Sequence, residues 1–549
     1  MSVDANSLGS VTDIAEEHAD RARPGVGPPG TPGDSRPGGP TPGRALRLLQ
    51  ELGYSEWRLG QREAVEAALE GRDSLVVMPT GGGKSLCYQL PGLATEDLTV
   101  VVSPLIALMR DQWTRLTRAG RPVAMISSGM SAEGAREALA QVRDGSARIV
   151  YCSPERFGST VFLEAVGRRR VDLMAVDEAH CVSEWGHDFR PDYLRLPEVA
   201  ARLGRPTIMA CTATATEAVA AEIVSRFGLR DPLRIRSGFD RPNISFDVVP
   251  LEGKGSVARR LALLGAGLSD PANRPAIVYC GTRRDTDELA AHLRERGLSA
   301  LAYHAGMEAA EREAAQERFM RGEAEVVVAT NAFGMGVDKA DVRSVWHMTI
   351  PTSLEAYYQE AGRAGRDGLP ARAALLAMKT DLGRLVRFNE QRHGDPELAI
   401  ARERGWRDYR TIKEFVYGES CRRRGVLDHF GDRAAGAPLG RCCDVCDPVE
   451  WLPDPATIAR TAGAATPPPE LAAADAPLFE RLKAWRLGAA QGKPAFTVAH
   501  NSTLTAIATA RPTDERSLAA IRGVGPSFIA KHGDEVLAIV RDGGESPGR

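Results

Sequence analysis

The sequence predicts an α/β protein with two doubly wound parallel-sheet lobes, followed by a small helical metal-binding module and an all-α domain. From residue 44, short apolar runs alternate with longer amphipathic segments, a pattern typical of buried parallel strands separated by helices. These runs fall into two series divided near residue 236, and polar or Gly-rich motifs follow several of them. Ligands bind at the carboxyl ends of strands in such folds, so these motifs predict the functional sites.

The composition is that of a globular protein with three or four domains, with 549 residues of which 43% are apolar and 26% charged. The formal net charge is −2, so any surface that binds nucleic acid must be locally basic. The amino terminus lacks the basic and apolar regions of a signal peptide, and no apolar run approaches the roughly 18 residues of a membrane span. We expect a soluble protein of the cytoplasm that contacts no membrane.

The chain divides into segments of different composition. Residues 1–43 are expected to be a disordered leader, because 14 of the 20 residues from Pro24 to Gly43 are Pro or Gly. The first lobe (44–235) is expected to contain the strands "SLVVM", "LTVVVSP", "ARIVYCSPE", "VDLMAVDEAH" and "TIMACTATA". The second lobe (236–385) is expected to contain "PAIVYCGT", "SALAYHAG", "AEVVVATN", "VRSVWHMTI" and "RAALLAM".

Three further segments follow the lobes. Residues 386–450 are expected to be helical and basic, with eight Lys or Arg against four Asp or Glu from Arg402 to Arg424. Residues 451–476 are Ala/Pro-rich and predict a linker. Residues 477–543 predict a small helical domain, with nine basic and six acidic residues between 478 and 543, before a short tail at 544–549.

A Gly-rich loop, "MPTGGGKS", follows the first strand and precedes an apolar helix. Its glycines would let backbone N–H groups surround phosphate oxygens, Lys84 would supply a positive charge, and the Ser85 hydroxyl could hold Mg²⁺. The general template has Gly where this chain has Met78, and an accidental Gly-rich turn is the alternative. The predicted nucleotide-binding residues of this loop are Thr80, Gly81, Gly82, Gly83, Lys84 and Ser85.

Two adjacent carboxylates, Asp177 and Glu178, end a later buried strand. An Asp in this position can hold Mg²⁺, and its neighbouring Glu can polarise the attacking water. Alone, such a pair is more often a surface feature. The Gly-rich loop that contains Lys84, called the phosphate loop, lies about 95 residues upstream and favours a catalytic role for the pair. We therefore predict a site that hydrolyses a nucleoside triphosphate.

Other candidate nucleotide contacts lie before the phosphate loop and near the end of the second lobe. In "GYSEWRLGQREAV", the Gln61 amide could pair with adenine, and Tyr54 or Arg58 could stack on the base; an amphipathic helix entry is the alternative. In "YYQEAGRAGRDG", Arg363 and Arg366 could act as arginine fingers on a γ-phosphate, and a solvated Arg pair is the alternative.

The motifs "MPTGGGKS", "DEAH", "TATA", "YHAGM", "ATNAFGMGVDK" and "QEAGRAGRDG", in this order, resemble the superfamily-2 helicases. The loop "CVSEWGHDFRPDY", the join "FDRPN" and a Cys cluster resemble the RecQ DNA helicases in particular, over residues 44–447. The C-terminal helices look like the HRDC domain of many RecQ proteins. This resemblance implies two RecA-like lobes that use ATP and Mg²⁺ to unwind DNA in the 3′→5′ direction, in DNA repair and recombination.

The resemblance also assigns nucleic-acid contacts. The aromatic-rich loop, Ser183 to Tyr193, would report strand binding to the carboxylates: Trp185 and Phe189 would stack on bases, and His187 and Arg190 would link that event to the nucleotide. A hydrophobic plug between the lobes is the alternative. Thr212 and Thr214 would couple hydrolysis to lobe closure. The expected strand-tracking residues are Ser103, Arg110, Ser153, Arg156, Thr330 and Asn331.

Nine Cys divide into two groups. Cys87, Cys152, Cys181, Cys211 and Cys280 are expected to be small buried thiols. Cys421, Cys442, Cys443 and Cys446 lie within 26 residues, which in a reducing compartment favours structural Zn²⁺ over disulfides. RecQ proteins usually separate their last three ligands, whereas Cys442 and Cys443 are adjacent here, so His429 is the alternative to Cys442.

A second departure from the family concerns strand separation. RecQ proteins commonly carry a winged helix between the zinc module and the HRDC domain, but only about 30 residues separate these parts here. We therefore expect another wedge or lower processivity, with the HRDC-like domain as a tethered auxiliary DNA contact. The expected partners are single-stranded and tailed or forked duplex DNA. An RNA-directed helicase and a DNA-remodelling or annealing ATPase are the alternatives.

Overall fold

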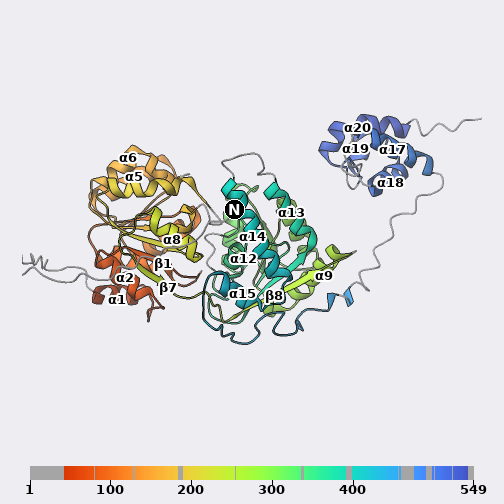
Figure 1. Ribbon diagram of the computed structural model, residues 1–549. Coiled ribbons are helices and arrows are strands. Elements are labelled where there is room, and N and C mark those ends of the chain that lie inside the picture. The colour runs from red at the N-terminus through yellow and green to blue at the C-terminus, as the bar shows by residue number, and fades with distance from the viewer. Residues whose placement is uncertain are drawn as a thin grey trace, which may run out of the picture.

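A computed structural model describes residues 42–79, 81–127, 130–183, 189–253, 255–334, 339–390, 399–455, 457–458, 475–489, 498–499, 501–521 and 524–541. Two parallel sheets, each covered by helices, form two lobes that lie side by side (Figure 1). A third group of helices stands apart from them at the C-terminal end. The predicted fold class is therefore confirmed.

The first lobe is built on a seven-stranded sheet in the order β3-β4-β2-β5-β6-β1-β7. Its strands are β1 (Ser74–Val77), β2 (Leu98–Val102), β3 (Val123–Ile126), β4 (Ile149–Cys152), β5 (Val171–Val176), β6 (Thr207–Thr212) and β7 (Leu233–Arg236). The central strands are buried on both faces and therefore appear as continuous apolar runs. The sequence prediction missed β3 and β7; β7 is an edge strand with exposed arginines, so it lacks an apolar run.

Helices cover both faces of this sheet. The α-helices are α1 (Pro42–Glu51), α2 (Gln61–Leu69), α3 (Lys84–Ala94), α4 (Ile106–Arg118), α5 (Ala132–Asp144), α6 (Thr160–Gly167), α7 (Leu196–Arg202) and α8 (Glu217–Arg226). The 3₁₀ turns are η1 (Pro154–Gly158), η2 (Ala179–Val182) and η3 (Pro191–Arg195). Because β5, β6 and β1 are neighbours, the loops that follow these three strands meet at one edge of the sheet.

The second lobe contains a six-stranded sheet in the order β10-β11-β9-β12-β13-β8. Its strands are β8 (Ile244–Leu251), β9 (Ala276–Tyr279), β10 (Ala300–Tyr303), β11 (Val326–Ala329), β12 (Ser344–His347) and β13 (Ala371–Met378). Its helices are α9 (Ser256–Ser269), α10 (Arg283–Glu295), α11 (Ala309–Met320) and α12 (Leu354–Ala361), with a 3₁₀ turn η4 (Pro271–Asn273). The connector between the lobes, residues 237–243, follows the predicted boundary.

A helical module packs on the edge of the second sheet. It comprises α13 (Lys379–Glu390), α14 (Ala399–Tyr417), α15 (Arg422–His429) and the Cys-containing loop. The backbone N–H of Phe246 in edge strand β8 donates to Cys442 O at 3.1 Å, and the N–H of Val248 donates to the Asp444 carboxylate at 3.0 Å. The module therefore covers part of an edge that would otherwise be open.

The first residues of the predicted linker are packed rather than free. The Trp451 ring lies 5.3 Å from the Trp346 ring and under the Arg372 guanidinium, and its indole N–H donates to Asp247 at 3.1 Å. Leu452 is buried in the same apolar cluster. Composition identified an Ala/Pro-rich stretch, but it did not reveal that its aromatic start belongs to the second lobe.

The C-terminal helices form a core of their own. They are α17 (Ala476–Ala489), α18 (Asn501–Ala510), α19 (Glu515–Ala519) and α20 (Pro526–Arg541). Leu482, Leu504, Leu518 and Val536 are fully buried among them. Within the described parts of the chain, no helix combines the length and the apolar character required to cross a membrane.

Candidate active site

A cavity of about 440 Å³ lies between the two lobes and brings the predicted nucleotide-binding residues together. The first lobe contributes the loop after β1, the start of α2 and the carboxylates after β5, and the second lobe contributes the segment after α12. Of the predicted residues, the cavity is lined by Tyr54, Arg58, Gln61, Gly81, Gly83, Lys84, Ser85, Asp177, Glu178, Arg363 and Arg366. Thr80 lies outside the described residues.

The phosphate loop runs from β1 into the N-terminus of α3, where Lys84 and Ser85 occupy the first helical turn. The Lys84 ammonium donates to the carbonyl oxygens of Met78 at 3.0 Å and Pro79 at 3.5 Å, so it lies across its own loop. Met78 is fully buried, and its N–H donates to Thr212 O at 3.1 Å. Met78, which replaces the glycine of the general template, therefore extends the pairing of β1 with β6, and it does not line the cavity.

Gln61 and Arg58 brace this loop in the structure. The Gln61 amide accepts from Arg58 N at 2.8 Å and donates to Gly83 O at 3.1 Å, and the Arg58 guanidinium donates to Gly81 O. Gly83 has φ 85°, and a Cβ there would lie 2.2 Å from the Gln61 amide nitrogen, so only glycine fits this position. The predicted pairing of Gln61 with adenine would have to replace its two present bonds.

Asp177 and Glu178 follow β5 directly and are nearly inaccessible to solvent. Burial, with a further contribution from the neighbouring Glu178 charge, raises the pKa of Asp177 to about 7. Glu178 has φ 48°, a left-handed conformation that is costly for a residue with a Cβ. Two buried carboxylates that face a cationic Lys84 are suited to hold a divalent cation, which would favour their charged forms.

Two residues that the sequence analysis did not assign connect this carboxylate pair to neighbouring segments. His180 Nδ1 lies 2.8 Å from the Thr212 hydroxyl and 3.4 Å from the Glu178 carboxylate. The Tyr193 hydroxyl, at the end of the aromatic-rich loop, donates to Asp177 O at 2.9 Å. The signal for both was present in the motifs, but only the folded chain reveals their partners.

Arg363 and Arg366 approach the same cavity from the second lobe. Both follow the end of α12, and Arg363 is only 4% exposed. The Arg366 side chain lies 3.5 Å from the position that a Cβ on Gly81 would occupy, so it reaches the phosphate loop. Two guanidinium groups therefore face Lys84 and the carboxylates across the junction of the lobes.

The predicted strand-tracking residues do not form one open surface. Ser103 and Ser153 are buried, and the Arg156 guanidinium donates to Ser127 O. Arg110 is half-exposed and forms an ion pair with Glu313 of α11, in the opposite lobe, at 2.6 Å. Thr330 and Asn331 follow β11, with Asn331 exposed. In this arrangement the Ser103 hydroxyl is buried and has no hydrogen-bond partner among the described residues, and the Ser153 side chain is only 4% exposed.

Part of the aromatic-rich loop can be described. Trp185 and His187 lie outside the described residues. Phe189 and Arg190 are partly buried, and Arg190 N donates to Cys181 O at 2.9 Å. The loop therefore begins directly after η2, and at Arg190 the chain contacts η2 again through Cys181. Tyr193 then bonds to Asp177.

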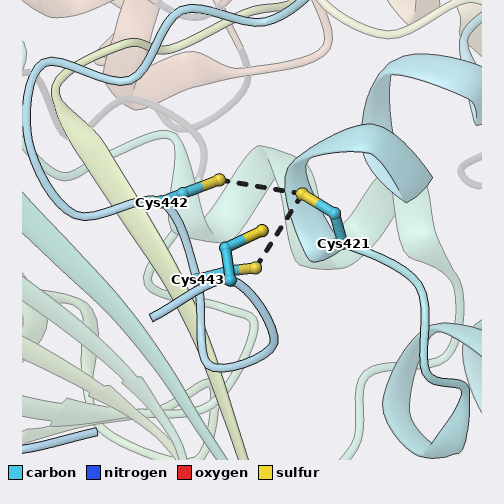
Figure 2. A group of neighbouring side chains, drawn as sticks. Cys421, Cys442 and Cys443 are labelled. Carbon is cyan, nitrogen blue, oxygen red and sulfur yellow. Dashed lines mark hydrogen bonds between the residues drawn. The ribbon is translucent and has the colours of Figure 1, made fainter. Parts of the chain in front are cut away.

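The four clustered cysteines are assembled near the start of α15, and Figure 2 labels three of them, Cys421, Cys442 and Cys443. Cys421 immediately precedes this helix and faces Cys442 and Cys443 on the loop, with sulfur–sulfur distances of 3.7 and 3.8 Å. All four sulfur atoms, including that of Cys446, lie within 4.8 Å of one another. Tetrahedral Zn²⁺ with bonds of about 2.3 Å requires sulfur separations of about 3.8 Å, so this donor set fits zinc.

His429, the alternative ligand, lies elsewhere. Its Nε2 is 2.7 Å from the Glu355 carboxylate of α12, and its ring contacts Phe430. The adjacent Cys442 therefore occupies the fourth position of the cluster. The other five cysteines, as predicted, are buried.

Comparisons with known proteins identify the family. Models of the DEAD/DEAH box helicase, the helicase conserved C-terminal domain and the HRDC domain match residues 58–223, 259–368 and 475–540. The ATP-dependent DNA helicase RecQ of Haemophilus influenzae is 40% identical over 403 residues, covering 73% of this chain and 63% of the relative. RecQ of Bacillus subtilis is 38% identical over 409 residues, covering 74% and 67%.

The chain belongs to the RecQ family. It spans less than two thirds of the length of its first two relatives, 63% and 62%. The fold also resembles the DEAD-box helicase Mss116 bound to ssRNA, with a TM-score of 0.53 at 18% identity over 63% of this chain and 75% of that one. For the Mycobacterium smegmatis helicase Lhr bound to ssDNA, the TM-score is 0.50 at 24% identity over 64% and 50%.

Proposed function

We propose that the chain is an ATP-dependent DNA helicase of the RecQ type, which couples ATP hydrolysis to 3′→5′ movement on single-stranded DNA and to duplex unwinding in repair or recombination. One observation carries this proposal. The interlobe cavity is lined by Lys84, Ser85, Asp177 and Glu178 from one lobe and by Arg363 and Arg366 from the other. Hydrolysis at such a site depends on the relative position of the lobes, which is how a motor converts chemistry into movement.

The residues of the cavity divide the chemistry among them. Lys84 binds the β- and γ-phosphates, and Ser85 and Asp177 hold Mg²⁺, which supplies charge neutralisation when bound. Glu178 orients and polarises the attacking water. Arg363 and Arg366 stabilise the charge that develops on the transferred phosphoryl group. The hydrogen bond between His180 Nδ1 and the Thr212 hydroxyl connects the Glu178 turn to the end of β6.

DNA is proposed as the substrate because the relatives from Haemophilus influenzae and Bacillus subtilis are named as DNA helicases and the chain carries the aromatic-rich loop of that family. Single-stranded DNA and tailed or forked duplexes are the expected forms, with the HRDC domain as an auxiliary contact. Bases stacked on Trp185 and Phe189 would give affinity without sequence preference. In a bacterial cell, such an enzyme would act at the nucleoid.

Two assays test the proposal. ATP hydrolysis should rise with single-stranded DNA and much less with RNA of the same sequence. Strand displacement should occur on a 3′-tailed duplex and be absent on 5′-tailed and blunt duplexes. Stronger stimulation by RNA would favour an RNA-directed helicase, and stimulation by DNA without displacement would favour a remodelling or annealing ATPase.

Replacing Trp185 by alanine should separate hydrolysis from strand binding. We expect DNA-stimulated hydrolysis to fall while hydrolysis without DNA is retained, because the substitution removes a stacking contact of about 1–3 kcal/mol per base and leaves the cavity residues unchanged. ATPase rates across a DNA titration measure both quantities. Full stimulation in Trp185→Ala would exclude a coupling role for this ring.

We infer that the Cys cluster binds structural Zn²⁺, held by Cys421, Cys442, Cys443 and Cys446. Its position supports this role, since it joins α15 to the loop that pairs with edge strand β8. A four-thiolate site has no open position for catalysis. The metal would therefore stabilise the helical module against the second lobe.

Replacing Cys421 by serine should remove the zinc and lower the melting temperature. Purified wild-type protein should contain about one zinc per chain and Cys421→Ser far less, because a four-thiolate site loses a quarter of its ligands. Elemental analysis and thermal unfolding measure the two effects. Cys280→Ala, at a buried thiol outside the cluster, should keep its zinc; equal zinc contents in Cys421→Ser and wild type would contradict the assignment.

A further inference from the structure

The segment that carries Arg363 and Arg366 is held by a residue from the connector between the lobes. Helix α12 ends at Ala361, and the backbone N–H groups of Gly362, Arg363 and Ala364 donate to its last carbonyl groups. The Arg241 guanidinium donates to Gly362 O at 2.7 Å, Ala364 O at 2.8 Å and Gly365 O at 3.2 Å. One side chain, 121 residues away along the chain from Gly362, therefore binds three carbonyl groups of the turn that follows this helix.

A second connector residue holds the same turn. The Asn243 amide nitrogen donates to Gly365 O at 2.7 Å and to Leu369 O at 2.8 Å. Gly365 has φ 55°, and a Cβ there would lie 2.4 Å from this amide nitrogen. The turn therefore requires glycine at this position and is fixed on both sides of Arg366.

The connector is in turn held by the helical module. Arg423 of α15 is only 3% exposed and forms an ion pair with Asp240. Its guanidinium also donates to Arg241 O at 3.0 Å and Ile244 O at 2.6 Å. The Asp240 carboxylate accepts a further bond from Ala437 N at 2.9 Å. The backbone on both sides of Arg241 is thus fixed by residues of the Cys-containing module.

We propose that Arg241 is a positioning residue for hydrolysis: it holds the turn that presents Arg363 and Arg366 to the nucleotide, and Arg423 of the helical module supports it. The proposal rests on the proposed ATPase function and deepens it. Arg241 acts through the backbone of the arginine turn and touches no substrate itself. Misplacement of a catalytic group by about 1 Å costs about a hundred-fold in rate, so a loosened turn should slow the chemistry.

The chemistry of Arg241 makes the substitution series informative. A planar guanidinium can serve three carbonyl groups at once, whereas a lysine ammonium keeps the charge and loses this geometry. Arg241→Ala should lower the kcat of DNA-stimulated hydrolysis about a hundred-fold, and Arg241→Lys should retain an intermediate rate. The KM for ATP should change less than about three-fold, since the phosphate loop is untouched.

A double-mutant cycle distinguishes positioning from a general structural role. In an Arg363→Ala/Arg366→Ala background the positioned groups are absent, so adding Arg241→Lys should lower kcat by less than about two-fold. Asp240→Asn, which weakens the Arg423 ion pair and leaves the guanidinium of Arg241 intact, should reduce kcat in the same direction by a smaller factor. Arg284→Ala, at a highly exposed arginine of the same lobe, is the matched control and should have the wild-type rate.

The experiment uses the whole 549-residue chain with saturating single-stranded DNA, and single-turnover kinetics resolve the slow variants. Thermal unfolding identifies any variant that fails to fold. If Arg241→Ala fails to fold, the kcat values of Arg241→Lys and Asp240→Asn are used to test the inference. A wild-type kcat in Arg241→Lys, a changed KM at constant kcat, or an undiminished effect in the Arg363→Ala/Arg366→Ala background would overturn the inference. Absence of DNA-stimulated hydrolysis in the wild type would instead overturn the proposed function.

Discussion

Lys84→Ala should abolish ATP hydrolysis, with a loss of about a thousand-fold or more in kcat, with and without DNA. Lys84 is the positively charged residue of the phosphate loop, and its ammonium donates hydrogen bonds to the carbonyl oxygens of Met78 and Pro79. When a nucleotide binds, the Lys84 ammonium would donate to phosphate oxygens in place of these carbonyl groups. Hydrogen bonds between charged groups are roughly twice as strong as those between neutral groups. Alanine removes that charge and leaves the surrounding loop in place.

The control for this substitution is Lys379→Ala, at an exposed lysine on α13 that pairs with Glu252. It should hydrolyse ATP at the wild-type rate. Phosphate release measured under saturating ATP and single-stranded DNA gives both values. A Lys84→Ala protein that retained more than about a tenth of the wild-type rate would place the hydrolytic site elsewhere.

Arg363→Ala should reduce kcat by about 10³ to 10⁵, the range typical of an arginine finger. Arg363 is almost completely buried at the junction of the lobes and lines the same cavity as Asp177 and Glu178. Its charge would be needed most when the phosphoryl group is being transferred. We therefore expect a much smaller change in KM than in kcat.

Arg363→Lys tests whether charge alone suffices at this position. A lysine cannot reproduce the two-pronged geometry of a guanidinium, so the variant should remain well below the wild-type rate. Nucleotide affinity measured with a non-hydrolysable analogue provides the control, because the first lobe is unchanged. Equal losses in affinity and kcat would contradict a role confined to the transition state.

The residues that line the interlobe cavity could be predicted from the sequence because most of their motifs follow a strand of a parallel sheet. Lys84 and Asp177 are separated by a long stretch of chain, but the rule that parallel sheets expose strand ends at one edge brings them together. Arg363 follows a helix of the second lobe, and its motif alone predicted its role. The cysteine cluster could also be predicted, because four thiols within 26 residues of a protein in a reducing compartment favour a metal site over disulfides. Only its fourth member needed the fold, which places His429 against Glu355.

Contacts between distant segments were not predictable in the same way. The bonds from Arg241 to the turn after α12 join residues more than a hundred positions apart, and the motif "FDRPN" gives no sign of them. Burial of Ser103 and Ser153 depends on how neighbouring loops pack, which hydroxyl-containing motifs do not reveal. The same holds for Trp451, whose partners Trp346 and Asp247 belong to the second lobe.

The most direct test of the proposed function is the rate of ATP hydrolysis by the purified 549-residue chain with and without a single-stranded DNA oligonucleotide. The rate without DNA should be low, and it should rise many-fold, to saturation, as the oligonucleotide is added. Hydrolysis at the same rate in both conditions would contradict the claim that strand binding controls the cavity between the lobes.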